Sequence, residues 1–182
     1  REQHRAEAAR VEEPPVPAAS RAGPWSRATP WLLGVILVVA VLLRVREAVR
    51  TPLWFDELFT LWMARHPLPE TMALLPGDIH PPLPTLLVSL WVAMAGESAL
   101  WLKALPLLLG MLAVLATFGF ARSLFGRPQA LLAAALLAVH PSHIYFSQEL
   151  RGYGLLTLVL LLSAWAAWRW VDTGRPRFAL AW

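Results

Sequence analysis

Cysteine is absent from this sequence, and charged residues are scarce. Only 15% of the 182 residues carry charge, which is less than a soluble domain needs to cover its surface. Without cysteine, disulfide bonds and thiolate metal sites are excluded. The sequence also has no internal repeat, the feature that indicates a transporter built from two related halves.

Hydrophobic residues make up 57% of the chain, and they come in long blocks. The mean hydropathy is +0.51. Long apolar blocks without an alternating or amphipathic pattern are typical of helices in lipid. The sequence therefore predicts an all-α fold, a polytopic transmembrane helical bundle. We expect five apolar segments, at about Pro30–Val49, Leu83–Ala95, Trp101–Ala121, Gln129–Phe146 and Gly154–Val171.

The basic residues mark connections and segment ends. The formal net charge is +4, and this distribution of arginines indicates contact with lipid headgroups and argues against nucleic-acid binding. Arg44 and Arg46 interrupt the far end of the first segment, and we expect their long side chains to snorkel to the interface. Tryptophans near segment ends fit interfacial anchoring; they are Trp31, Trp54, Trp101, Trp168 and Trp170.

Two polar regions flank the first segment. Residues 1–29 are rich in Arg, Glu, Ala and Pro and cannot bury a core, so we expect a disordered tail, placed in the cytoplasm. Residues 50–80 form the longest polar connection, with Glu57–Arg65 and Glu70–Leu75 as short amphipathic helices on the membrane surface. Function concentrates on such loops. The end of the chain reads as the opening of another apolar segment, so we expect the membrane domain at 30–182 to be incomplete at its C-terminus.

The first cluster that could carry chemistry is Leu53-Trp54-Phe55-Asp56-Glu57. Two adjacent carboxylates stand beside aromatic residues at a membrane boundary. Partial desolvation makes a carboxylate a better proton acceptor, which suits a general base or a metal ligand. The alternative is a solvated helix N-terminus, where acidic residues complement the helix dipole.

Two further clusters lie at segment ends. Asp78-Ile79-His80-Pro81-Pro82 combines an acid and an imidazole with a rigid step, although a turn before a helix explains it equally well. His140–Arg151 sets Glu149 beside Arg151, for which an interfacial ion pair is the alternative. We expect His140 and His143 to be interface residues and not metal ligands, because no further ligand-spaced Cys or His accompanies them.

Together these stretches resemble the GT-C membrane glycosyltransferases, in the family 39-like branch related to protein O-mannosyltransferases and aminoarabinose lipid A transferases. The resemblance runs from about residue 42 to 171. It is carried by Leu53–Glu57, Asp78–Leu83, Arg122-Ser123-Leu124-Phe125-Gly126-Arg127 and Ser147-Gln148-Glu149-Leu150-Arg151-Gly152-Tyr153, in this order. The chain departs from its relatives at Pro84, where an aromatic residue is common, and at Gly152 and Gly154, where bulkier residues are usual.

The resemblance implies a hexosyl- or pentosyltransferase. Such enzymes pass a sugar from a polyprenyl-phosphate donor to a lipid, glycan or protein acceptor on the extracytoplasmic face of the inner (plasma) membrane, with inversion. It implies that Asp56 is the catalytic base. A divalent metal, Mg²⁺ or Mn²⁺, is left open, and Asp56, Glu57 and Glu149 are the candidate ligands. The supporting or substrate-binding residues are Glu57, Asp78, His80, Glu149 and Arg151.

Two other classes of protein remain as alternatives. A multi-pass transporter is expected to carry ionisable groups in mid-span, facing a pathway, whereas the acids here stand at segment ends. A non-catalytic membrane scaffold needs no loop of acids and aromatic residues. A loss of sugar transfer on replacing Asp56 by Asn would separate the enzyme from both.

The number of membrane crossings decides whether Asp56 and Glu149 lie on the same face of the membrane. If every apolar segment crossed once, Asp56 and Glu149 would lie on opposite faces. Arg122 and Arg127 flank the connection between the third and fourth segments, which the positive-inside rule places in the cytoplasm. The second segment, short and interrupted by Pro84, is therefore expected to be a partial or re-entrant span.

Overall fold

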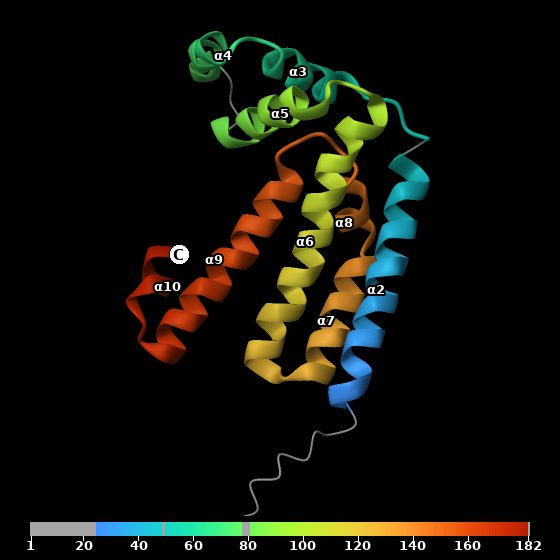
Figure 1. Cartoon of the computed structure of the whole chain (residues 1–182), viewed down its shortest axis with the longest axis vertical. Helices are drawn as coiled ribbons and strands as arrows, with labels where there is room; N and C mark the ends of the chain where they lie inside the picture. Colours follow the sequence, from blue (N-terminus) through green and yellow to red (C-terminus); the bar gives the residue numbers. More distant parts are fainter. Residues whose placement is uncertain (1–24, 49, 78–80, 182) are drawn as a thin grey trace, which may run out of the picture.

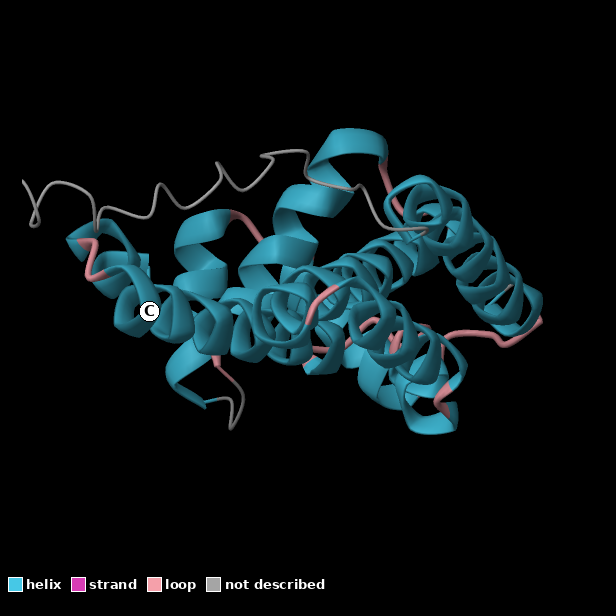
Figure 2. Cartoon of the chain, turned by 90° about the horizontal axis from the view of Figure 1, so that it is seen from below, coloured by secondary structure: helices cyan, strands magenta, loops and turns pink. Residues whose placement is uncertain are grey.

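The computed structural model describes residues 25–48, 50–77 and 81–181. Every regular element among them is a helix, which confirms the all-α prediction, and Figure 2 shows helices joined by short loops. The helices are α2 (Trp25–Ala48), α3 (Phe55–Ala64), α4 (Leu68–Leu74), the short 3-10 helix η1 (Leu75–Gly77), α5 (Pro82–Ala95), α6 (Ala99–Phe125), α7 (Arg127–Val139), α8 (Pro141–Phe146), α9 (Tyr153–Thr173) and α10 (Pro176–Ala181).

Three of the described helices, α2, α6 and α9, are long and apolar enough to cross a membrane. At 1.5 Å per residue, the 27 residues of α6 give a length of about 40 Å, enough for a hydrocarbon core of about 30 Å. Helices α2, α6 and α7 run along the long axis of the molecule, and α9 slants away from α6 (Figure 1). The outward faces of α2 and α9 are largely exposed and apolar, as helix surfaces in contact with lipid are.

The start of α2 corrects the predicted boundary of the N-terminal tail. Residues 1–24 lie outside the described residues, but 25–29 belong to α2 and not to the tail. The prediction used Pro30 as the helix start. Pro30 is instead the sixth residue of α2, where it removes one hydrogen bond of the helix ladder without ending the helix.

Helices α3, α4 and α5 lie across one end of the bundle (Figure 1). The predicted surface helices at 57–65 and 70–75 correspond to α3 and α4, and each begins two residues earlier than predicted. The 14 residues of α5 span only about 21 Å, too short to cross. Because α5 packs against α3 and does not cross, the chain enters α6 and leaves α8 at this same end.

The predicted fourth segment is broken in two. Pro141 has no N–H group to continue the ladder of α7, and the chain restarts as α8 after His140. Because α7 ends here, the carbonyl of Ala138 is open to a donor from outside the helix. Arg44 Nη1 donates to it over 2.9 Å. Arg44 is 0% exposed and also donates to His143 Nδ1 over 2.6 Å.

Arg44 therefore corrects a prediction. It does not snorkel to the interface, because its guanidinium satisfies buried acceptors that the α7–α8 break leaves open. Arg46, two residues on, is exposed as expected.

Helix α6 stands at the centre of the fold, between two apolar clusters. One joins it to α2 and α7, where small residues let the helices approach closely; its buried members are Ala40, Val114, Phe118, Ala121, Ala130, Leu131, Ala134 and Ala138. The other joins α6 to α3, α5 and α9 and to the turn before α9; its buried members are Leu61, Ala64, Val88, Leu102, Leu105, Leu109, Ala116, Leu150 and Leu158.

A tryptophan pair fixes the hairpin between α5 and α6. The rings of Trp91 and Trp101 stack with centroids 4.2 Å apart and planes at 6°. Each indole N–H donates to the other residue's carbonyl, over 2.8 Å and 2.9 Å. Ser98 caps α6 by accepting from the backbone N–H of Trp101. These contacts hold α5 against the upper end of α6.

Candidate active site

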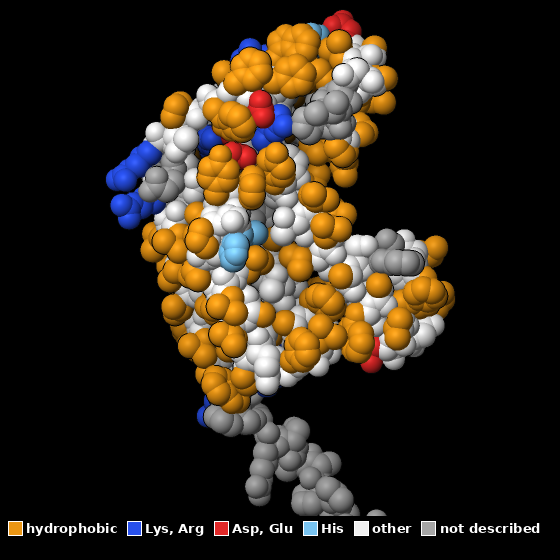
Figure 3. Space-filling view, turned by 180° about the vertical axis from the view of Figure 1, so that it is seen from behind, with side chains coloured by type: hydrophobic (Ala, Val, Ile, Leu, Met, Phe, Trp, Pro, Cys, Tyr) orange, Lys and Arg blue, Asp and Glu red, His pale blue; other side chains and the backbone are white. Residues whose placement is uncertain are grey.

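The structure brings two of the predicted clusters together. Asp56 and Glu57 occupy the first turn of α3, and Glu149 and Arg151 lie in the turn between α8 and α9. Both segments belong to the end of the bundle that α3 and α5 cover (Figure 1). Figure 3 shows acidic and basic side chains gathered at this end among hydrophobic ones. Asp78 and His80 lie outside the described residues.

Asp56 faces Arg151 across this site. One guanidinium nitrogen, Nη2, lies 3.6 Å from Asp56 Oδ2, and Nη1 donates to the Asp56 carbonyl over 3.2 Å. The Asp56 side chain is 37% exposed, while that of Arg151 is only 9% exposed. The carboxylate is therefore open to an incoming molecule, and a cation held by the fold stands beside it.

Glu57 has a different environment from its neighbour. Its side chain is 0% exposed. Oε1 accepts from the backbone N–H of Leu150 over 2.6 Å, and Oε2 accepts from that of Trp54 over 3.2 Å. The second bond satisfies a free N–H group at the start of α3, as a glutamate in this position of a helix does. Glu57 thus closes its own helix and binds the turn before α9.

Lys103 is the residue of the site that sequence reasoning missed. It lies near the start of α6, and its Nζ donates to Glu57 over 2.8 Å and 3.0 Å and to the Gln148 carbonyl over 3.1 Å. A charged residue inside an otherwise apolar segment is a signal that could have found it. Removing one member of such a buried pair strands the other charge, which costs about 3–5 kcal/mol.

Glu149 is buried beneath the site, and the hydroxyl of Tyr145 is its hydrogen-bond partner. That hydrogen bond and the negative charge of Glu149 raise the pKa of Tyr145 above its ordinary value. His143, expected at the interface, is buried and accepts from Arg44. His140 is exposed.

An apolar cavity of about 310 Å³ opens beside Arg151, between α5 and α9. Arg151 stands among its wall residues, with Thr60, Thr85 and Tyr153 as the other hydrogen-bonding side chains; the apolar wall includes Phe59, Leu83, Pro84, Leu156 and Val159. We call it the α5–α9 groove. A mostly apolar wall with one cation suits an amphipathic ligand that carries a negative group.

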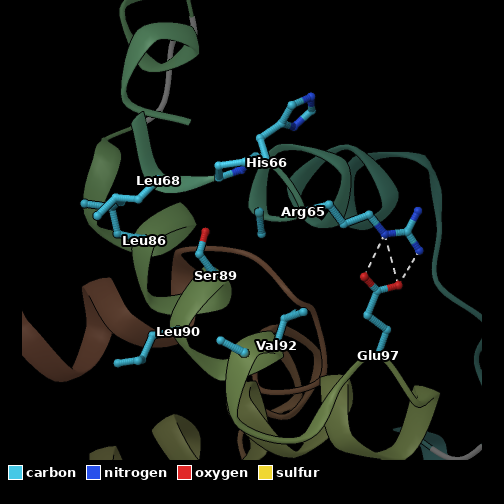
Figure 4. A pocket seen from close by; sticks show the side chains of 11 residues that line it. Arg65, His66, Leu68, Leu86, Ser89, Leu90, Val92 and Glu97 are labelled. Atoms are coloured by element: carbon cyan, nitrogen blue, oxygen red, sulfur yellow. Dashed lines mark hydrogen bonds and ion pairs between the residues drawn. The ribbon is translucent and has the colours of Figure 1, made fainter. Parts of the chain in front are cut away.

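A larger open cavity of about 660 Å³ lies at the other end of α3, against α5. Arg65 and Glu97 form an exposed ion pair at its rim, and Leu86, Leu90 and Val92 belong to its wall (Figure 4). Arg65 Nε donates to both Glu97 oxygens, over 2.9 Å and 3.0 Å. This pair holds the pKa of Glu97 below its usual range. The cavity lies apart from Asp56, which stands in the first turn of the same helix.

The three candidate metal ligands, Asp56, Glu57 and Glu149, do not form a metal site in the part of the chain that the structure describes. Both oxygens of Glu57 accept from Lys103 Nζ, and each also accepts from a backbone N–H group. Because its oxygens already have these donors, this carboxylate does not fit a metal. Among the described residues, no group of three or more His, Cys, Asp or Glu side chains could hold an ion. The metal stays a prediction, because Asp78 and His80 fall outside that part of the chain.

Comparison with known families decides the class of protein. Residues 79–182, more than half of the chain, match the family described as dolichyl-phosphate-mannose-protein mannosyltransferase. The chain belongs to this family. It is a membrane glycosyltransferase of the GT-C type, from a family that uses a lipid-linked sugar donor. The matched stretch contains Lys103, Glu149 and Arg151, whereas Asp56 and Glu57 precede it. Neither curated proteins nor solved structures gave a match.

Proposed function

We propose that the protein transfers a hexose or pentose from a polyprenyl-phosphate donor to a lipid, glycan or protein acceptor, with Asp56 as the general base. The observation that carries this proposal is the pairing of Asp56 with Arg151 beside the α5–α9 groove. A half-exposed carboxylate and a buried cation meet beside the apolar α5–α9 groove. The family uses a lipid-linked sugar donor. We assign the groove to the lipid of this donor and Arg151 to its phosphate.

The proposed reaction is a single displacement. The acceptor's hydroxyl or amine forms a bond to the anomeric carbon, and the bond from that carbon to the donor phosphate oxygen breaks. The electron pair of the broken bond leaves with the lipid phosphate, and the acceptor's proton passes to the Asp56 carboxylate. Attack from the face opposite the leaving group inverts the anomeric centre. Arg151 would stabilise the negative charge that grows on the phosphate.

The α5–α9 groove is the proposed site for the first part of the donor's isoprenoid chain. Its wall is apolar, and Arg151 lies within it, so a chain lying there brings its phosphate to the guanidinium. Leu156 is 56% exposed on α9 and belongs to the wall, whereas Leu160, 59% exposed and four residues further, does not. Because residues four apart share a helix face, the two leucines form a matched pair for a test.

The test compares Leu156→Trp with Leu160→Trp for transfer of labelled sugar from a long-chain polyprenyl-phosphate donor. We expect Leu156→Trp to raise the KM for that donor and Leu160→Trp to leave it unchanged. A donor with a truncated lipid should show no difference between the two variants. Equal kinetics of both variants with the long donor would exclude the groove as the lipid site.

The proposed orientation puts this site on the extracytoplasmic face of the plasma membrane and the N-terminal tail in the cytoplasm. The connection between α6 and α7, at the opposite end of the bundle, carries Arg122 and Arg127 and no acid, which favours the cytoplasm. The end with the site carries residues of both signs; the acids are Asp56, Glu57, Glu70, Glu97 and Glu149, and the basic residues are Arg46, Arg50, Arg65, Lys103 and Arg151.

A further inference from the structure

Lys103 is held by three acceptors. It is 5% exposed, near the start of α6. The ammonium group has three hydrogens, and among the described residues its hydrogen bonds go to the two Glu57 oxygens and the Gln148 carbonyl. The charge is therefore committed to the protein itself and is not offered to a ligand.

These contacts join the two segments that form the site. Glu57 follows Asp56 in α3, and it also accepts from Leu150, the residue before Arg151. Gln148, the other partner of Lys103, belongs to the same turn. The first turn of α3 and the turn before α9 are thus tied to α6 through one buried ion pair.

We infer that Lys103 is a positioning residue for sugar transfer: through Glu57 and the 148–151 turn it holds Asp56 opposite Arg151. The inference rests on the proposed role of Asp56 as the base. Loss of the pair would let the two segments shift against each other, and an error of about 1 Å in placing a reacting group can cost about 100-fold in rate.

The exposed pair Arg65–Glu97 supplies a matched control. It joins the C-terminal end of α3 to the α5–α6 connection, and its side chains are 54% and 34% exposed. It therefore tests the loss of an ion pair on the same helix without disturbing the contact between α3 and the 148–151 turn.

The experiment measures transfer from a polyprenyl-phosphate donor by the complete protein in detergent or liposomes. We expect Lys103→Met to lower kcat roughly 10- to 100-fold with little change in the KM for the donor. Arg65→Met should leave both constants near those of the unaltered protein. Lys103→Arg, which keeps the charge and the donors, should recover part of the lost turnover.

The double variant Glu57→Gln with Lys103→Met separates positioning from folding. It leaves no buried charge unpaired, so its thermal unfolding should lie closer to that of the unaltered protein than the unfolding of Lys103→Met does. We expect its kcat to stay low. Recovery of kcat together with stability would show that the pair serves folding only and would overturn the inference, as would normal turnover in Lys103→Met. If Lys103→Met does not insert, the double variant carries the test.

Asp56→Asn, assayed in the same experiment, distinguishes a failure of the proposed function from a failure of the positioning role of Lys103. Loss of activity in Asp56→Asn with normal turnover in Lys103→Met would leave the proposed function standing and reject only the positioning role. Normal turnover in Asp56→Asn would reject the proposed base, and the positioning role with it.

Discussion

Gly152 packs directly against the ring of Pro84. A Cβ atom added at Gly152 would lie 2.9 Å from Pro84 Cγ, closer than carbon atoms approach without strain. The two residues come from the turn before α9 and from the first turn of α5, and both belong to the wall of the α5–α9 groove. We expected the chain to differ from its relatives at both positions, and in the structure the two residues meet in one contact and shape one wall.

Gly152→Ala should therefore strain the groove. The backbone at Gly152 has φ −69° and ψ −5°, which alanine adopts freely, so any effect is steric. Overpacking of this kind costs about 1–3 kcal/mol, seen as a lower unfolding temperature and a raised KM for the lipid donor. Pro84→Ala in the same chain should relieve both.

Gly154→Ala is the control for that substitution, because its added Cβ would lie 3.5 Å from Leu109 Cβ, an ordinary contact. Equal behaviour of the two alanine variants would contradict the steric explanation.

Arg44→Met should destabilise the bundle. It removes the donor from the Ala138 carbonyl and from His143 Nδ1, and each buried polar group left unsatisfied costs about 1–3 kcal/mol. Thermal unfolding in detergent measures the loss. Arg46→Met, on the exposed side of the same helix, should have little effect. A similar loss in both variants would mean that the buried contacts of Arg44 add nothing beyond a surface charge.

The ionisation of Tyr145 should report the carboxylate of Glu149. Glu149 raises the pKa of Tyr145, so Glu149→Gln should move its ionisation to lower pH. The ultraviolet difference between each protein and its Tyr145→Phe counterpart isolates this group.

The pH dependence of stability follows from the raised pKa of Tyr145. The contribution of Tyr145 is fully present below the ordinary pKa of tyrosine, and it is lost as pH rises through the higher folded value. An unchanged titration in Glu149→Gln would place the carboxylate elsewhere.

The orientation in the membrane can be tested with single cysteines, since the sequence contains none. Met72 in α4 is 50% exposed, and Gln129, in the first turn of α7 at the opposite end, is also exposed. We expect an impermeant thiol reagent to label Met72→Cys in intact cells and Gln129→Cys only after lysis. The reverse pattern would invert the proposed topology.

The sequence was sufficient for the large features of the fold. Long apolar blocks predict α2, α6 and α9 because lipid requires helices that satisfy their own backbone. The charges of Arg122 and Arg127, together with the shortness of the segment around Pro84, predict that the second apolar segment does not cross the membrane. Helix α5, which this segment forms, is too short to cross.

Features that depend on contacts between distant segments could not be predicted in the same way. The buried position of Arg44 depends on a carbonyl that Pro141 leaves open almost one hundred residues later, as the separation of 94 between Arg44 and Ala138 shows. The partner of Glu57 is 46 residues away in α6. Adjacent acids look alike in a sequence, whereas burial separates Asp56, which is half-exposed, from Glu57, which is enclosed.

Replacing Asp56 by Asn tests the central claim most directly. Turnover is measured at saturating lipid donor, so that weaker binding is not mistaken for slower chemistry. Loss of a general base lowers the rate by about 10²–10⁴-fold, and we expect kcat of Asp56→Asn to fall within that range with expression and membrane insertion unchanged. Glu70→Gln, which removes an exposed acid from α4, should retain normal kcat. Near-normal turnover in Asp56→Asn would contradict the account.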